Sequence, residues 1–179
     1  MTANQHDVPA DLTAIEAALG RMVHRAGTLE TVVRFAGEAL ASTREDRDEL
    51  AGTTAGRVLS LTEKIAGDSK DVSPEEYAEL TAIFAEIRPR LDSRNVYIHG
   101  GWVRMGGQLV AFNKKKNVEA NAKKDIAADK YRVETRPVAV EELNELSIAL
   151  LDLSNRVFDW TDAILRRKNP DLYPADANK

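Results

Sequence analysis

Three polar residues that suit phosphate chemistry lie close together in the middle of the chain. Arg94 and Asn95 are adjacent, and His99 follows directly before the Gly100-Gly101 pair. Histidine accepts and donates protons near neutral pH, whereas arginine stays protonated and can hold a phosphate as negative charge develops on it. An arginine, an amide and a histidine are therefore a minimal set for cleaving RNA without a metal ion, through attack of the ribose 2′-hydroxyl and formation of a 2′,3′-cyclic phosphate.

The spacing of these residues limits how they can cooperate. On an ideal helix Asn95 and His99 share a side, but Arg94 and His99 are about 140° apart. They converge on one ligand only if the helix is distorted or if His99 lies just past its regular end. The glycine pair suits such an end, where the helix dipole favours the imidazolium. The alternative interpretation is structural: Arg94 pairs with a carboxylate such as Glu30, and His99 caps a helix end.

Apolar residues that recur every three or four positions predict the long elements that position this motif. Two long helices are expected, over about Asp11–Ser42 near the start and Val140–Arg167 near the end. A weaker second helix is expected over Asp46–Ala66, because it contains glycines and threonines that disfavour a helix. At about 1.5 Å per residue the first helix is roughly 45 Å long, so part of it is expected to pack against a second subunit.

A third helix has a clear start signal and leads into the motif. Ser73 suits an N-cap, Pro74 the first helical position and Glu76 the end of a capping box. Its apolar stripe begins at Tyr77 and, if continued, reaches Arg94, which predicts an inward position for that arginine. Since proline breaks or kinks helices, Pro89 predicts that the motif lies on a separate short helix.

The periodicity changes after the motif. Val103–Phe112 and Tyr131–Val140 read as strands, with Lys114–Lys130 as their long connection. We therefore predict a mainly α fold, an up-down bundle of four to five helices with a small β-hairpin insertion before the last helix. Residues 1–179 form a single domain in this prediction, with the insertion at 103–140 and a polar tail at 170–179.

Composition indicates a cytoplasmic protein without cofactor or metal. The net charge is −4, cysteine is absent, and no apolar run is long enough to span a membrane. The charge is uneven: residues 113–136 hold eight Lys or Arg and four Asp or Glu, so this window is +4 and the rest −8. A lysine-rich segment is usually a solvated loop, but here it follows the motif and is a candidate for contacting RNA phosphates. The candidate RNA-binding residues are Lys114, Lys115, Lys116, Lys123 and Lys124.

The Arg94-Asn95-x-x-x-His99 pattern resembles the Arg-x(4–6)-His motif of the HEPN superfamily, the higher eukaryotes and prokaryotes nucleotide-binding domains. Motifs of that superfamily often carry asparagine directly after the arginine. The expected helices, the chain length and an insertion between helices are similar to HEPN domains as well.

The resemblance implies a metal-independent endoribonuclease of a toxin or defence system, with Arg94 and His99 as catalytic pair and Asn95 as supporting residue. It also implies a homodimer with the two motifs facing each other, RNA as substrate, and an antitoxin protein as a partner. Glu30 is the candidate for a further acidic residue at the site. Two other hypotheses remain: a non-catalytic HEPN-like helical dimer that acts as a nucleotide-binding or adaptor module, and an unrelated helical bundle in which Arg94 and His99 are structural.

Overall fold

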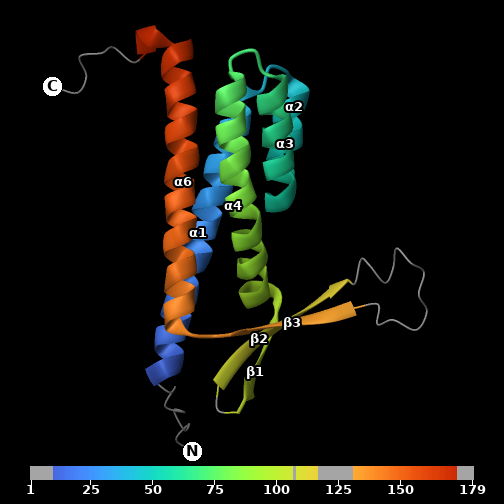
Figure 1. Cartoon of the computed structure of the whole chain (residues 1–179), viewed down its shortest axis with the longest axis vertical. Helices are drawn as coiled ribbons and strands as arrows, with labels where there is room; N and C mark the ends of the chain where they lie inside the picture. Colours follow the sequence, from blue (N-terminus) through green and yellow to red (C-terminus); the bar gives the residue numbers. More distant parts are fainter. Residues whose placement is uncertain (1–9, 107, 117–130, 173–179) are drawn as a thin grey trace, which may run out of the picture. The chain divides into compact units, whose positions relative to one another are not determined.

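Five α-helices and three β-strands make up the part of the chain that the structure describes. This structure is a computed structural model, and it describes residues 10–106, 108–116 and 131–172 (Figure 1). The helices are α1 (Ala10–Leu40), α2 (Arg44–Ala51), α3 (Ala55–Asp68), α4 (Pro74–His99) and α6 (Val140–Lys168), followed by a 3₁₀ turn, η1 (Pro170–Leu172). The strands lie between α4 and α6 and are β1 (Gly101–Met105), β2 (Gln108–Lys116) and β3 (Tyr131–Pro137). The predicted mainly α class, with a small β insertion before the last helix, is confirmed.

The chain forms two compact units, and each is described by itself. The first unit comprises Met1–Val23 and Leu91–Ser147, and the second comprises His24–Arg90 and Ile148–Lys179. Three helices, α1, α4 and α6, contribute a segment to each unit. The motif that begins at Arg94 therefore belongs to the first unit, together with the sheet.

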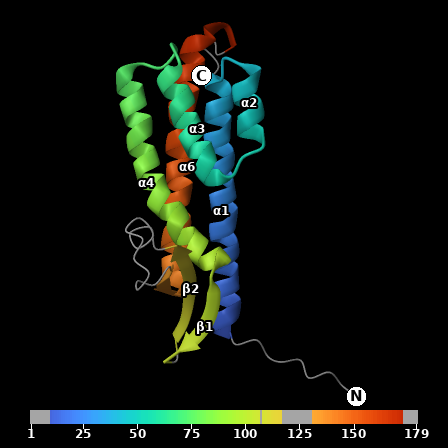
Figure 2. The same cartoon turned by 90° about the vertical axis from the view of Figure 1, so that its right-hand side faces the viewer.

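The second unit consists of helices packed on a buried apolar core. The buried Thr62 hydroxyl in α3 donates to the backbone oxygen of Val33 in α1 at 3.2 Å. Trp160 Nε1 in α6 donates to the backbone oxygen of Glu76 in α4 at 2.9 Å. Figures 1 and 2 both show α3 beside the first half of α4. These contacts link the four longer helical segments of this unit.

The predicted apolar stripes are the faces that the helices bury. In α6 every stripe residue is buried: Leu143, Leu146, Leu150, Leu153, Val157, Trp160 and Ile164. In α1 the stripe is buried except at Leu12 and Leu19, which are half-buried. A period of three to four residues therefore identified the core faces correctly.

The predicted capping box at the start of α4 is confirmed. The Ser73 backbone N–H donates to Glu76 Oε2 at 2.8 Å, and the Glu76 N–H donates to Ser73 Oγ at 3.2 Å. The expectation that Tyr77 points inward is wrong, since its side chain is 36% exposed. Its ring instead covers Gly67, where an added Cβ would lie 3.2 Å from the ring.

The second predicted helix is two helices. α2 ends at Ala51, and α3 begins at Ala55. The Arg34 guanidinium donates to the backbone oxygen of Leu50 and, at 3.3 Å, to that of Thr53. The bond to Leu50 satisfies a carbonyl group that the end of α2 leaves without an intrahelical partner, and the bond to Thr53 fixes the segment between α2 and α3.

The expected break at Pro89 is absent, because α4 runs from Pro74 to His99 without interruption. Proline inside a helix removes one backbone hydrogen bond and costs about 3 kcal/mol. Ile87 and Leu91, on either side of Pro89, are buried, and we attribute the continuity of α4 to this packing. The motif therefore lies on the last turns of a long helix.

The insertion is a three-stranded antiparallel sheet in the order β1-β2-β3, so it has one strand more than the predicted hairpin. The segment Val103–Phe112, predicted as one strand, contains a turn at Gly106 that separates β1 from β2. Gly106 has φ +55°, a conformation that favours glycine. The register pairs Gly101 with Phe112 and Phe112 with Thr135.

The two faces of the sheet differ in exposure. Side chains alternate between faces along a strand, and Ala111 in the middle of β2 is completely buried. The opposite face carries exposed apolar residues: Val103 (40%), Met105 (59%), Phe112 (39%) and Val133 (61%). We call these four residues the exposed sheet face.

Candidate functional site

Arg94 lies on the last turns of α4, and its side chain is half-buried. Its Nη1 atom donates a hydrogen bond of 2.9 Å to Asn95 Oδ1, and its Nε atom is buried. The neighbouring Leu91 and Val96 are buried as well. The guanidinium is therefore held by its surroundings, and the adjacent amide orients it.

His99 is the last residue of α4, and its side chain is exposed. Because α4 is helical through this residue, Arg94 and His99 are about 140° apart around the helix axis, whereas Asn95 and His99 share a side. The two conditions for convergence within one chain, a distorted helix end or a histidine beyond the helix, are not met. The His99 side chain is accessible, but within a single chain the helix points it away from the side on which Arg94 lies.

Tyr97, inside the motif, anchors the end of α4 to α6. Its hydroxyl donates a hydrogen bond of 2.9 Å to Glu142 Oε2. The backbone oxygen of Pro137 is a second acceptor for this hydroxyl, at 3.3 Å. Burial raises the pKa of Tyr97, and the Glu142 carboxylate raises it further, so the phenol stays protonated as a donor. Tyr97 was not among the residues predicted from the sequence to position the motif. Its signal was a tyrosine at an apolar position three residues after Arg94.

The glycine pair joins the end of α4 closely to the sheet. Gly100 N–H donates to the Val96 backbone oxygen at 3.1 Å. A Cβ on Gly100 would lie 2.2 Å from that oxygen and 2.5 Å from the Phe112 backbone oxygen. Trp102 Nε1, directly after the pair, donates to the Tyr97 backbone oxygen at 3.0 Å. The predicted helix end at Gly100 is correct. At this residue the chain passes so close to the backbone oxygens of Val96 and Phe112 that a side chain does not fit.

Glu30, the candidate acidic partner, lies in α1 within the second unit, whereas Arg94 belongs to the first. Its side chain is half-buried, and its Oε1 atom is buried. A role for Glu30 at the site remains a prediction.

The structure describes the candidate RNA-binding lysines only in part. Lys114, Lys115 and Lys116 lie in β2, where only their backbone is described, and pair in register with 133, 132 and 131 of β3. Lys123 and Lys124 lie outside the described residues. Their role therefore stays a prediction.

Chemically, the end of α4 provides a fixed guanidinium, an amide and an accessible imidazole. Among the described residues, no group of three or more His, Asp or Glu side chains is arranged to hold a metal ion. No described helix is both long and apolar enough to cross a membrane. No known family model, curated protein or solved structure matches the chain.

Proposed function

We propose that this protein is a metal-independent endoribonuclease of HEPN type, a toxin or defence effector that acts on RNA in the cytoplasm. The observation that carries the proposal is the end of α4: Arg94 is half-buried and oriented by Asn95 at 2.9 Å, while His99, at the last position of the helix, is exposed. A fixed cation and an accessible acid-base group are what phosphodiester cleavage needs.

The proposed site is shared between two copies of the chain. Arg94 and His99 are about 140° apart on a regular helix, so a single chain offers a phosphate only one of them. A two-fold axis beside the end of α4 allows Arg94 of one copy and His99 of the other to face the same phosphate. Each dimer then contains two equivalent sites in one cleft.

In the proposed reaction the neutral His99 imidazole removes the proton of a ribose 2′-hydroxyl. The 2′-oxygen attacks the adjacent phosphorus, the bond to the 5′-oxygen of the next nucleotide breaks, and that oxygen takes up a proton from water. The His99 imidazolium then returns the proton that it removed to the solvent. The products are a 2′,3′-cyclic phosphate and a 5′-hydroxyl. Arg94 stabilises the charge that develops on the phosphoryl oxygens, and the guanidinium remains protonated throughout.

A second candidate is a non-catalytic helical dimer that binds nucleotides or acts as an adaptor. The observation that favours it is the separation of Arg94 from His99 within one chain, because a regular helix directs the two side chains to different sides. In that case Arg94 binds an anion and His99 has no acid-base role.

RNA cleavage by the purified protein, with and without EDTA, distinguishes the two candidates. The ribonuclease cleaves in both conditions, and His99→Ala and Arg94→Ala each reduce the rate by at least about a hundredfold. His24→Ala and Arg90→Ala are matched controls, since both residues are exposed on α1 and α4 outside the motif, and they retain full activity. Equal cleavage by the wild type and the motif variants would reject the nuclease.

Expression in a bacterial host tests the proposed toxin role separately. The wild type is expected to arrest growth, and His99→Ala is expected to be harmless at equal protein level. An antitoxin partner would be identified as a protein that restores growth when it is expressed together with the wild type.

A further inference from the structure

The exposed sheet face carries an aromatic ring that the fold holds in place. Phe112, in β2, is 39% exposed, and the end of its ring lies over Gly101, where an added Cβ would be 2.4 Å from the ring carbon Cζ. The backbone oxygen of Phe112 lies close to Gly100, at 2.5 Å from an added Cβ. Because both neighbours are glycines, the ring packs on bare backbone and still remains open to solvent.

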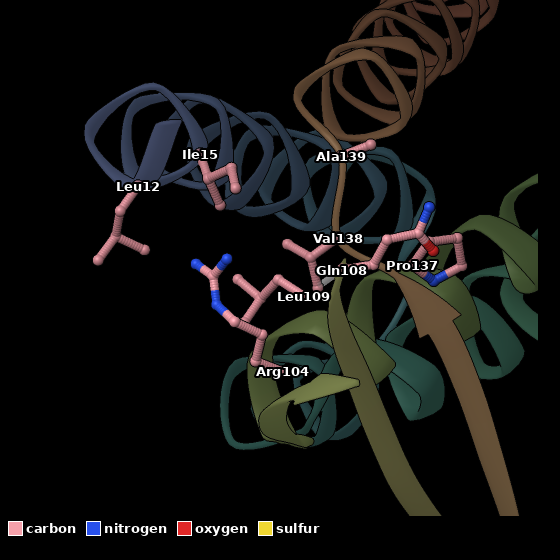
Figure 3. A pocket seen from close by; sticks show the side chains of 8 residues that line it. All are labelled: Leu12, Ile15, Arg104, Gln108, Leu109, Pro137, Val138 and Ala139. Carbon is pink, nitrogen blue, oxygen red and sulfur yellow. The ribbon is translucent and has the colours of Figure 1, made fainter. Parts of the chain in front are cut away.

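The ring lies on the face of the sheet that the start of α1 does not cover. Side chains alternate between faces along a strand, so Arg104 and Leu109, which pair in register, lie on the face opposite to Phe112. These two side chains line a pocket together with Leu12 and Ile15 of α1 (Figure 3). The start of α1 therefore lies against the opposite face and leaves the Phe112 ring accessible.

The position of this ring in the chain is directly beside the candidate nuclease site. Gly100 and Gly101, which contact Phe112, follow His99 at the end of α4. The Cα atoms of His99 and Gly101 are at most about 7 Å apart, whereas a stacked nucleic-acid strand rises about 3.4 Å per nucleotide. A base on the Phe112 ring would therefore belong to a nucleotide about one or two positions from a phosphate at His99.

The charge of β2 favours a nucleic acid over a second copy of the chain on this face. The strand ends in three consecutive lysines and contains no acidic residue, and Lys114 is in register with Val133 of the exposed sheet face. Two copies of such a strand repel each other, whereas phosphates are attracted to it. An exposed aromatic ring on a basic strand is a combination by which proteins bind unpaired bases.

We propose that Phe112 stacks against an unpaired base of the RNA substrate and thereby helps to place a neighbouring phosphate at His99. This inference rests on the proposed nuclease and adds Phe112 to it as a substrate-binding residue. Bases inside a duplex are already stacked on their neighbours, so their faces are not available to the ring. Every base has such a face, so the contact selects single strands and tolerates different sequences.

Binding of an RNA that cannot be cleaved tests this proposal independently of nuclease activity. The probe is a fluorescein-labelled single strand of about ten nucleotides, with 2′-O-methyl groups that block the attacking hydroxyl. Phe112→Leu should weaken its binding to the full-length protein roughly tenfold, measured by fluorescence anisotropy, and Phe112→Tyr should retain it. Phe35→Leu is the matched control, because Phe35 is 42% exposed on α1, and it should bind like the wild type. When the probe is annealed to its complement, the wild type and Phe112→Leu should bind it equally.

Cleavage kinetics separate the base contact from the chemistry. Stacking is present both before and during the reaction, so Phe112→Leu should raise the KM for single-stranded RNA about tenfold and leave kcat near the wild-type value. His99→Ala should instead lower kcat. A wild type that binds the 2′-O-methyl strand through Phe112 but cleaves no RNA would reject the nuclease and support the base contact.

A crosslink in the wild-type protein provides a second measurement, which also covers a Phe112→Leu variant that does not fold. RNA that contains 5-iodouridine couples on irradiation to an aromatic side chain stacked on the modified base, and mass spectrometry should find it on the peptide that contains Phe112. Equal affinity of the wild type and Phe112→Leu for the single strand, or a crosslink only elsewhere, would overturn the proposal. Sedimentation that shows a dimer lost in Phe112→Leu, with RNA binding unchanged, would assign the face to a second copy instead.

Discussion

The Tyr97 hydroxyl donates a hydrogen bond of 2.9 Å to the Glu142 carboxylate and thereby joins the last turn of α4 to the first turn of α6. Both residues belong to the first unit. Tyr97 is 4% exposed and lies between Arg94 and His99 in the sequence. The direction in which the helix end presents its polar residues therefore depends on Tyr97, which the proposed reaction does not use.

Replacing Tyr97 by Phe should remove this bond and keep the ring packing. We expect the free energy of unfolding to fall by about 1 kcal/mol, the usual contribution of one hydrogen bond, as measured by urea denaturation. Tyr77→Phe is the matched control, because Tyr77 is 36% exposed, and it should change the stability little. An unchanged midpoint for Tyr97→Phe would show that the bond does not stabilise the fold.

The same residue predicts a loss of stability at high pH. The pKa of Tyr97 is raised above its ordinary value of 10.0, mainly by burial and then by Glu142. A raised pKa in the folded state means that stability is complete below pH 10 and decreases as the pH rises above it, because the unfolded chain releases the proton first. Urea midpoints between pH 9 and 11 should fall more steeply for the wild type than for Tyr97→Phe. Parallel profiles would argue against this linkage.

The ionisation of Glu76 predicts how the stability of the protein changes at low pH. Its pKa is lowered from 4.5, mainly by the hydrogen bond from Arg167, with Ser73 contributing. A lowered pKa means that the stability is present above pH 4.5 and is lost as the pH falls below it. Glu76→Gln should flatten the stability profile between pH 5 and 3, measured by thermal unfolding. Glu75→Gln, one residue earlier and exposed, should retain the slope of the wild type, and equal slopes for both variants would contradict the assignment.

The glycine at the end of α4 should tolerate no side chain. Gly100→Ala places a Cβ against two backbone oxygens, at 2.2 and 2.5 Å, and should cost about 3 kcal/mol. Gly20→Ala in α1 has no atom within 4 Å of its new Cβ, so it should stabilise the protein by about 0.5–1 kcal/mol. Chemical denaturation of both variants checks this pair. A stable Gly100→Ala would mean that the sheet can move away from the helix end.

The sequence predicted the long helices well because each buries one face. The stripe that includes Leu150 and Val157 repeats with the helical period, and the Ser73–Glu76 capping box marks a start by local hydrogen bonds. Both signals lie within a few residues of the feature they predict. They therefore need no knowledge of the rest of the fold.

Features that depend on distant contacts were predicted less well. The end of α2 is stabilised by Arg34, sixteen residues before Leu50, and the pattern around Gly52 does not reveal that contact. Pro89 remains in a helix, which we attribute to the packing of the buried Ile87 and Leu91 on either side of it. In the proposed nuclease, Arg94 and His99 act on one phosphate only across a second copy of the chain, and the periodicity of one chain does not describe such a contact.

The exposed sheet face has a consequence for handling the protein in solution. Val103, Met105, Phe112 and Val133 are presented together on one side of a small sheet, and a net charge of −4 gives only weak repulsion between molecules. Adding salt screens that repulsion further. The solubility of the protein is therefore expected to decrease with ionic strength. A single Val133→Glu substitution, which removes an apolar side chain and adds a negative charge to the net charge of −4, should raise the solubility.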